Sequence, residues 1–227
     1  EDLNALEQAL RLKDTIEGTT VHVLTMGPGR AAEIIREAMY RGADGGYLLS
    51  DRAFAGSDTL ATSYALSCAL RNLEYDVIIC GRQAIDGDTA QVGPQIAEKL
   101  DLPQVTYVEE FHIDDNLHDI TVKRQLEDGY ELIGIKTPCM LTAIKELNEP
   151  RFMNMINLYG DTKSKIKIWN AKDIEVDLKK VGLEASPTNV FRSFTPAPKA
   201  PGQVVAGDTE NEQAKNLLVQ LKGKHII

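Results

Sequence analysis

The stretch Asp76–Gly93, DVIICGRQAIDGDTAQVG, decides the fold of this 227-residue chain. Its first residues have the length and the β-branched content of a buried parallel strand. The loop that follows leads into a predicted helix, and the N–H groups in the first turn of a helix attract phosphate. We expect Asp88 or Thr89 to cap this helix, and Gly81 and Gly87 to let a ligand approach the backbone closely. The stretch therefore predicts a site for a phosphate-bearing ligand.

The same alternation of strand and helix runs through the first half of the chain. The spacing of apolar residues predicts helices over 2–14, 30–41, 58–73 and 90–100, and strands over 19–25, 45–50 and 76–80. This alternation is typical of an α/β protein with a mostly parallel sheet flanked by helices, which is a Rossmann-like fold. Because the alternation opens with a helix, for which Asp2 is the expected N-cap, we expect a first strand upstream of residue 1.

The second half of the chain has a different pattern. Apolar alternation predicts strands over 104–113, 120–126, 130–136 and 139–144, which would add antiparallel strands to the sheet. From about residue 148, charged residues and prolines predict an extended arm lying on a surface, closed by a helix over 210–222. We therefore predict an α/β nucleotide-binding domain at 1–146, and a loop with a C-terminal arm and terminal helix at 147–227.

The composition argues against nucleic acid and membrane insertion, and it indicates a reducing compartment. A net charge of −9 argues against nucleic acid, whose phosphates require a basic face. No apolar run approaches the roughly 20 residues that a membrane span needs, so no membrane insertion is expected. The three cysteines lie in apolar segments, which indicates buried, reduced thiols and a cytoplasmic location.

The residue pattern offers no catalytic group and no metal site. We find no Ser or Cys nucleophile with a His partner and no acid–base pair. Asp86 and Asp88 could hold Mg²⁺, but two acids in a loop more often serve as turn and cap residues. The loop Arg82–Gly93 matches neither the Walker pattern nor G-x-G-x-x-G. A protein that binds a nucleotide without catalytic side chains indicates that the ligand carries the chemistry, as a redox cofactor does.

Three stretches of the chain resemble one known family. They are Glu1–Asp14 (EDLNALEQALRLKD), Gly81–Pro94 (GRQAIDGDTAQVGP) and Leu147–Phe152 (LNEPRF). The resemblance is to the β subunit of electron transfer flavoprotein, and it runs along the whole chain. It implies a heterodimer in which the α subunit holds FAD, while the β subunit holds AMP or, in electron-bifurcating members, a second FAD. The family also begins with a strand, which agrees with the strand expected upstream.

The resemblance implies two sets of binding residues. The cofactor would lie against Asp2, Met26, Gly27, Gly81, Arg82, Gln83, Ala84, Ile85, Asp86, Gly87, Asp88, Thr89, Ala90, Gln91, Val92 and Gly93. The partner-recognition loop would consist of Leu147, Asn148, Glu149, Pro150 and Arg151. In this loop Leu147 would insert into a hydrophobic pocket of an acyl-CoA dehydrogenase. Without the resemblance, Leu147 would be interpreted as an ordinary core leucine at the end of a strand.

The type of family member is indicated by the loop itself. The sequence DGDTAQVG resembles that of electron-bifurcating β subunits, and the small Ala90 and Gly93 would leave room for a ligand longer than AMP. The resemblance then implies that the bound FAD takes a hydride from NADH. One electron would go to ferredoxin or flavodoxin, and the other, through the α-subunit FAD, to an acyl-CoA-type dehydrogenase. Two alternatives stay open: a conventional β subunit with structural AMP, and an unrelated α/β module that senses ATP.

Overall fold

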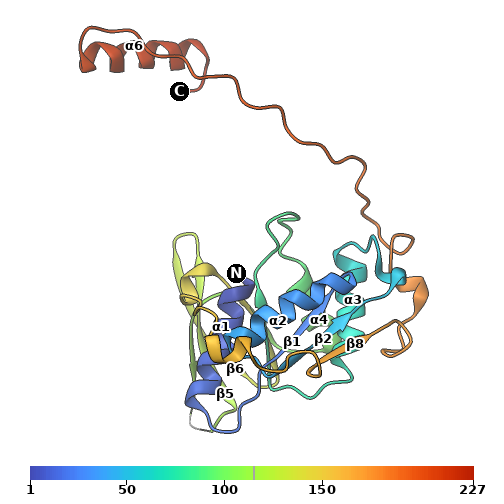
Figure 1. Cartoon of the computed structure of the whole chain (residues 1–227). Coiled ribbons are helices and arrows are strands. Elements are labelled where there is room, and N and C mark those ends of the chain that lie inside the picture. The colour runs from blue at the N-terminus through green and yellow to red at the C-terminus, as the bar shows by residue number, and fades with distance from the viewer. Residues whose placement is uncertain (115) are drawn as a thin grey trace. The chain divides into compact units, whose positions relative to one another are not determined.

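The computed structural model describes residues 1–114 and 116–227, which divide into two compact units, Glu1–Asn189 and Val190–Ile227 (Figure 1). The helices of the first unit are α1 (Asp2–Thr15), α2 (Ala32–Arg41), α3 (Thr59–Leu70), α4 (Val92–Leu100) and α5 (Met155–Leu158). Its strands are β1 (His22–Met26), β2 (Gly45–Leu49), β3 (Val77–Gly81), β4 (Gln104–Ile113), β5 (Asp119–Leu126), β6 (Gly129–Lys136), β7 (Cys139–Ala143) and β8 (Ile166–Trp169). Short 3₁₀ turns are η1 (Gly29–Ala31), η2 (Arg52–Phe54), η3 (Lys145–Leu147) and η4 (Leu178–Lys180).

The strands form two sheets. The first has the order β1-β2-β8 and is parallel throughout. The second has the order β3-β7-β4-β5-β6, in which β3, β7 and β4 are parallel, whereas β4, β5 and β6 pair antiparallel. The predicted α/β class, with antiparallel strands added to parallel ones, is confirmed.

Helices cover both faces of the parallel strands. Leu48 and Leu49 are consecutive in β2 and therefore point to opposite faces. Leu48 packs in a cluster with Leu10 of α1 and with side chains of α2, whereas Leu49 packs with Ala65 and its neighbours on α3. Helix α3 also packs against α4, and both contribute to a cluster around Met140 of β7. Helices α1 and α2 therefore cover one face, and α3 and α4 the other.

One prediction about the second half of the chain is wrong. The segment 161–180 was expected to belong to an extended arm, but β8 pairs with β2 in parallel, with Ile166 opposite Gly46. Ile174 and Val181, which follow β8, are buried in the same cluster as Leu49. The alternating apolar residues of this segment therefore complete the first sheet and its core.

The second unit contains α6 (Glu210–Gly223), which confirms the predicted terminal helix. The side chain of Thr209 caps this helix by accepting a hydrogen bond from the amide of Glu212. The residues between 190 and 207 have no helix or strand.

The described residues contain neither a candidate membrane span nor a candidate metal cluster. Within residues 1–114 and 116–227, no helix is both long enough and apolar enough to cross a membrane. In the same residues, no group of three or more His, Cys, Asp or Glu side chains is placed to hold a metal ion.

Candidate functional site

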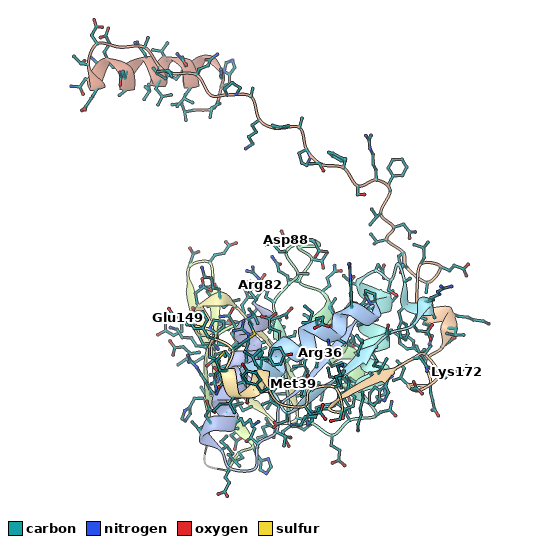
Figure 2. The ribbon with its side chains drawn as sticks, viewed as in Figure 1. Arg36, Met39, Arg82, Asp88, Glu149 and Lys172 are labelled. Atoms are coloured by element: carbon teal, nitrogen blue, oxygen red, sulfur yellow. The ribbon has the colours of Figure 1, made fainter. Side chains whose placement is uncertain are left out.

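The loop that joins β3 to α4 is the most exposed connection among the predicted site residues. Its side chains from 84 to 89 are exposed, and Ile85 is fully exposed. Figure 2 shows Asp88 out on this loop and Arg82 at its base. Asp88 and Ala90 both have a left-handed backbone, with φ of 51°, which is strained for residues other than glycine. Strain of this kind is typical of functional loops.

Helix α4 begins without a side-chain cap. Its N-cap residue is Gln91, whose side-chain oxygen instead accepts a hydrogen bond from the Thr59 hydroxyl of α3 at 2.8 Å. The expectation that Asp88 or Thr89 caps the helix is wrong, because the Asp88 carboxylate accepts a hydrogen bond from Gln83 within the loop. Among the described residues no side chain occupies the first-turn N–H groups of α4. An uncapped helix N-terminus is suited to bind an anion such as phosphate.

Arg82 lies at the base of the loop beside polar atoms that lack partners. Its guanidinium forms an ion pair with Glu1 at 3.0 Å and lies 5.3 Å from the centre of the Tyr107 ring. The Nε of Arg82 and the Oε2 of Glu1 are buried, and neither has a hydrogen-bond partner in the part of the chain that the structure describes. Because such atoms are costly to bury unpaired, this position suits a polar group of a bound nucleotide.

Tyr107 is a neighbour of the site that sequence reasoning missed. Strand β4 has a bulge between Val105 and Val108, and within it Tyr107 has a φ of 60°. The backbone N–H of Tyr107 donates to the Thr142 hydroxyl at 3.2 Å, which holds the bulge on β7. Residues 104–113 alternate like an ordinary strand, so the sequence carries no signal for the bulge.

The first turn of α1 contacts the end of β3. Asp2 was predicted to be the N-cap of α1, but it is the first helical residue, and the N-cap is Glu1. The Asp2 carboxylate accepts a hydrogen bond from the backbone N–H of Gly81 at 2.8 Å, and a Cβ added at Gly81 would lie 2.7 Å from the same oxygen. The absent side chain of Gly81 therefore makes room for α1, and the approach of a ligand to this backbone stays a prediction. Gly87 has open space around it.

Three further predicted cofactor residues, Gly93, Met26 and Gly27, lie outside the exposed part of the loop. A Cβ added at Gly93 would lie 2.9 Å from Cγ2 of Thr142 and 3.0 Å from Sγ of Cys80, so this glycine allows α4 to pack on the sheet. That it also leaves room for a longer ligand stays a prediction. Met26 is the last residue of β1 and Gly27 follows it, and no hydrogen bond between described residues joins them to the β3–α4 loop. Burial raises the pKa of Cys80 to about 12, so its thiol is no nucleophile at neutral pH.

The predicted partner-recognition loop, Leu147–Arg151, begins with the last residue of η3. Leu147 is half-buried and packs against the cluster of β4 and β7 that contains Val108 and Leu141. It also lines a groove of about 520 Å³ with side chains of α1 and β4. These contacts are those of a core leucine at a strand end, and insertion of Leu147 into a partner stays a prediction. Glu149 is exposed.

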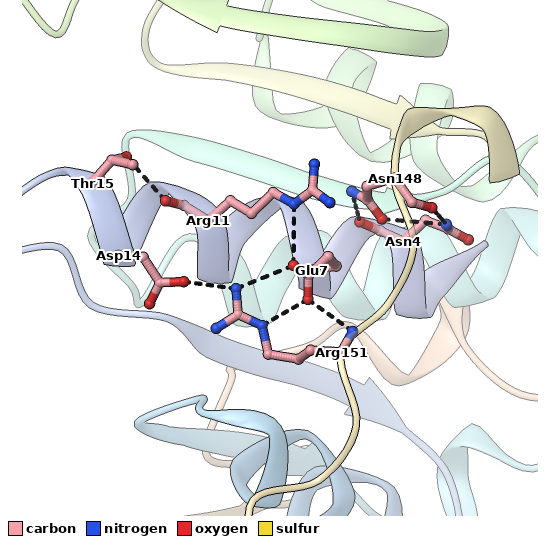
Figure 3. Close-up of polar contacts among 7 residues, drawn as sticks. All are labelled: Asn4, Glu7, Arg11, Asp14, Thr15, Asn148 and Arg151. Carbon is pink, nitrogen blue, oxygen red and sulfur yellow. Dashed lines mark hydrogen bonds and ion pairs between the residues drawn. The ribbon is translucent and has the colours of Figure 1, made fainter.

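Two side chains of this loop are fixed to α1 (Figure 3). The Nδ2 of Asn4 donates to the backbone oxygen of Asn148 at 2.6 Å, and the Nδ2 of Asn148 donates to the backbone oxygen of Asn4 at 3.0 Å. Arg151 donates from Nε and Nη2 to the two carboxylate oxygens of Glu7, at 2.8 and 3.1 Å, and from Nη2 to Asp14 at 2.7 Å. We call these three contacting pairs of α1 and the loop, Asn4–Asn148, Glu7–Arg151 and Asp14–Arg151, the α1 clamp.

Glu7 is the centre of the α1 clamp, and its side chain is only 6 % exposed. Burial acts to raise the pKa of Glu7, but hydrogen bonds from the Arg151 side chain and amide and from Arg11 outweigh it, so the pKa lies below its ordinary value. Glu7 is therefore ionised at neutral pH. The sequence signal was weak: Asn4 and Glu7 are polar residues on the buried face of an amphipathic helix.

Comparison with known proteins gives matches along the whole chain. Residues 1–174 match the model of the electron transfer flavoprotein domain. The chain is 51 % identical over 228 residues to the caffeyl-CoA reductase-Etf complex subunit CarD of Acetobacterium woodii. It is 50 % identical over 228 residues to the electron transfer flavoprotein subunit beta of Thermoanaerobacterium thermosaccharolyticum, and 45 % identical over 235 residues to the acryloyl-CoA reductase electron transfer subunit gamma of Anaerotignum propionicum. Each match covers 100 % of this chain and 86 % of the relative.

Proposed function

Because the chain belongs to the electron transfer flavoprotein family, as a β subunit, we propose that it holds an adenine-nucleotide cofactor at the β3–α4 loop. It does so in a heterodimer with an α subunit, and the complex passes electrons to an acyl-CoA-type dehydrogenase. Two observations carry the cofactor site: the uncapped N-terminus of α4 at the end of the loop, and the buried, unpaired atoms of Arg82 and Glu1 at its beginning. The residues present therefore fit a nucleotide with a phosphate at the helix and a polar group at Arg82.

The proposed cofactor is FAD, with NADH as electron donor and ferredoxin or flavodoxin as a second acceptor. Support comes from the sequence DGDTAQVG and from relatives that are named as electron-transfer subunits of caffeyl-CoA and acryloyl-CoA reductases. FAD, when bound, supplies the chemistry that takes a hydride and releases electrons one at a time. The residues of this chain bind and orient the cofactor: Arg82, which is paired with Glu1, offers its unpaired Nε as a hydrogen-bond donor, and the exposed Ile85 offers an apolar contact. The proposed location is the cytoplasm, where the free thiols would stay reduced.

Structural AMP is the second candidate for the same site. The packing of Gly93 against Thr142 and Cys80 favours it to a limited extent, because the missing side chain of Gly93 no longer argues for a longer ligand. With AMP, this chain would support the α subunit and its flavin and would not react with NADH.

The decisive experiment counts the cofactors. The native αβ complex is denatured, and the released FAD and AMP are quantified by chromatography against the protein concentration. We expect two FAD and no AMP per αβ complex, and bleaching of the flavin absorbance by NADH. One FAD and one AMP per complex, with no bleaching by NADH, would show that the site holds structural AMP, as in the second candidate. If neither nucleotide is released in proportion to this chain, the proposed function is wrong.

A pair of variants locates the site. Arg82→Gln should weaken retention of the nucleotide about tenfold, because a hydrogen bond to a charged group contributes about 1.5–3 kcal/mol. The matched control is Lys136→Gln on β6, which removes one positive charge from a side chain that is 82 % exposed. Equal retention by both variants would show that the nucleotide does not contact Arg82.

A further inference from the structure

The loop after η3 depends on α1 for its backbone conformation. Residues 148–154 contain no helix or strand, so their polar backbone groups cannot be satisfied by a regular ladder. The backbone oxygen of Asn148 accepts from the side chain of Asn4, and the backbone N–H of Arg151 donates to Glu7 at 3.1 Å. At its far end, the amide of Asn154 donates to the backbone oxygen of Tyr40 at 2.8 Å. Side chains of α1 therefore hold the first half of the loop, and Arg41 of α2 also donates to the backbone oxygen of Arg151.

The two side chains of α1 that hold the loop, Glu7 and Asn4, are polar groups whose burial costs free energy. The side chain of Glu7 is 6 % exposed and Asn4 is 5 % exposed, on the face of α1 that packs against the protein. An apolar residue at either position would pack without the cost of removing a charge or an amide from water. A buried carboxylate that meets a guanidinium through two parallel hydrogen bonds fixes both the position and the orientation of its partner. The α1 clamp thus specifies one loop geometry.

The α1 clamp leaves the neighbouring side chains free. Glu149 is exposed, and Phe152, which directly follows Arg151, is 93 % exposed. The loop therefore presents side chains outward from a backbone that is already held. Holding a loop in its bound conformation lowers the entropy lost on binding, so it strengthens association without adding a contact to the partner.

We propose that Glu7 and Asn4 are positioning residues, which hold the partner-recognition loop on α1 in the conformation that an acyl-CoA-type dehydrogenase binds. The inference rests on the proposed function for the identity of the partner, but the two residues lie outside the recognition loop itself. Helix α1 also contacts the end of β3, where the β3–α4 loop begins, because the backbone N–H of Gly81 donates to Asp2. Because that contact does not involve Glu7 or Asn4, their replacement should leave the cofactor in place.

The test compares αβ complexes that carry Glu7→Gln, Asn4→Ala or the control Glu17→Gln, which removes the same charge from an exposed residue beyond the end of α1. The complexes are reduced with dithionite and mixed with a purified short-chain acyl-CoA dehydrogenase at increasing concentrations. Electron transfer is followed by stopped-flow absorbance. Hydrogen exchange of the peptide spanning 147–154 and the flavin content are measured on the same samples.

Glu7→Gln and Asn4→Ala should each raise the concentration of dehydrogenase at half-maximal rate by about tenfold, since the loop must then be ordered during binding. The maximal rate and the flavin content should stay unchanged, exchange of peptide 147–154 should become faster, and Glu17→Gln should behave as wild type. Faster exchange with an unchanged half-maximal concentration would overturn the inference, because the loop would then be held without consequence for binding. Loss of flavin in both variants would also overturn it, since the residues would then support the whole fold. If the wild-type complex itself transfers no electrons to any acyl-CoA dehydrogenase tested, it is the proposed function that fails.

Discussion

Replacement of Gly93 by alanine tests how closely α4 packs on the sheet. In an open helix position the change would stabilise the protein by about 1 kcal/mol, because alanine is the better helix former. Here the new Cβ would lie 2.9 Å from Cγ2 of Thr142 and 3.0 Å from Sγ of Cys80. Thr142 cannot turn away at low cost, since its hydroxyl accepts the N–H of Tyr107 at 3.2 Å and it is 1 % exposed.

Overpacking of a close-packed core costs about 1–3 kcal/mol, and the two very short contacts of the added Cβ place Gly93→Ala in the upper part of this range, at about 2–3 kcal/mol. After the helix gain of about 1 kcal/mol is subtracted, we expect the free energy of unfolding to fall by about 1–2 kcal/mol. With a urea dependence of about 2 kcal/mol per M, the unfolding midpoint should fall by about 0.5–1 M. The assay is the fluorescence of Trp169, the only tryptophan of the chain, during urea unfolding of the chain without added nucleotide.

The matched control is Gly134→Ala in β6, where an added Cβ would have no atom within 4 Å. This variant carries the same change in the unfolded chain and should unfold at or above the wild-type midpoint. A Gly93→Ala protein with a midpoint equal to or above that of wild type would refute the reasoning that Gly93 serves close packing.

Two further predictions concern titratable groups. Burial raises the pKa of Cys80 to about 12 and that of Cys139 to about 11, so iodoacetamide at pH 8 should leave both unlabelled in the folded protein and label both in urea, as read by mass spectrometry. Labelling of either in the folded chain would contradict this. Burial acts to raise the pKa of Asp44, but the ion pair with Lys13 and a backbone N–H outweigh it, so the folded pKa lies below the ordinary 3.8. The carboxylate therefore stabilises the fold above pH 3.8 and loses this contribution as the pH falls through the folded pKa. Asp44→Asn should lower the urea unfolding midpoint at pH 7. The difference in midpoint between the variant and wild type should shrink below pH 3.8. A difference in midpoint that does not depend on pH would argue against the ion pair.

Much of the fold could be predicted because it depends on neighbours in the sequence. The alternation of short apolar runs with helical spacing placed three parallel strands and four helices within a few residues of their observed ends. The segment around β8 was misassigned because its four strand residues, Ile166–Trp169, are too short to be recognised without β2 beside them. A strand of this length is defined by its pairing partner, which lies about 120 residues earlier.

The candidate site also combines features that depend on neighbours in the sequence with features that depend on distant segments. The sequence alone determined that a turn-rich loop leads from a buried strand into a helix, because strand length, turn residues and helix spacing are local properties. Only the tertiary structure decided that α4 starts uncapped, that Gly81 and Gly93 serve packing, and that Glu7 holds Arg151 across 144 residues of chain. These features depend on where α1, β4 and β7 lie in space. Hydrogen bonds and steric contacts between distant segments leave no periodic trace in the sequence, so the residues that position the two loops appear only once the chain is folded.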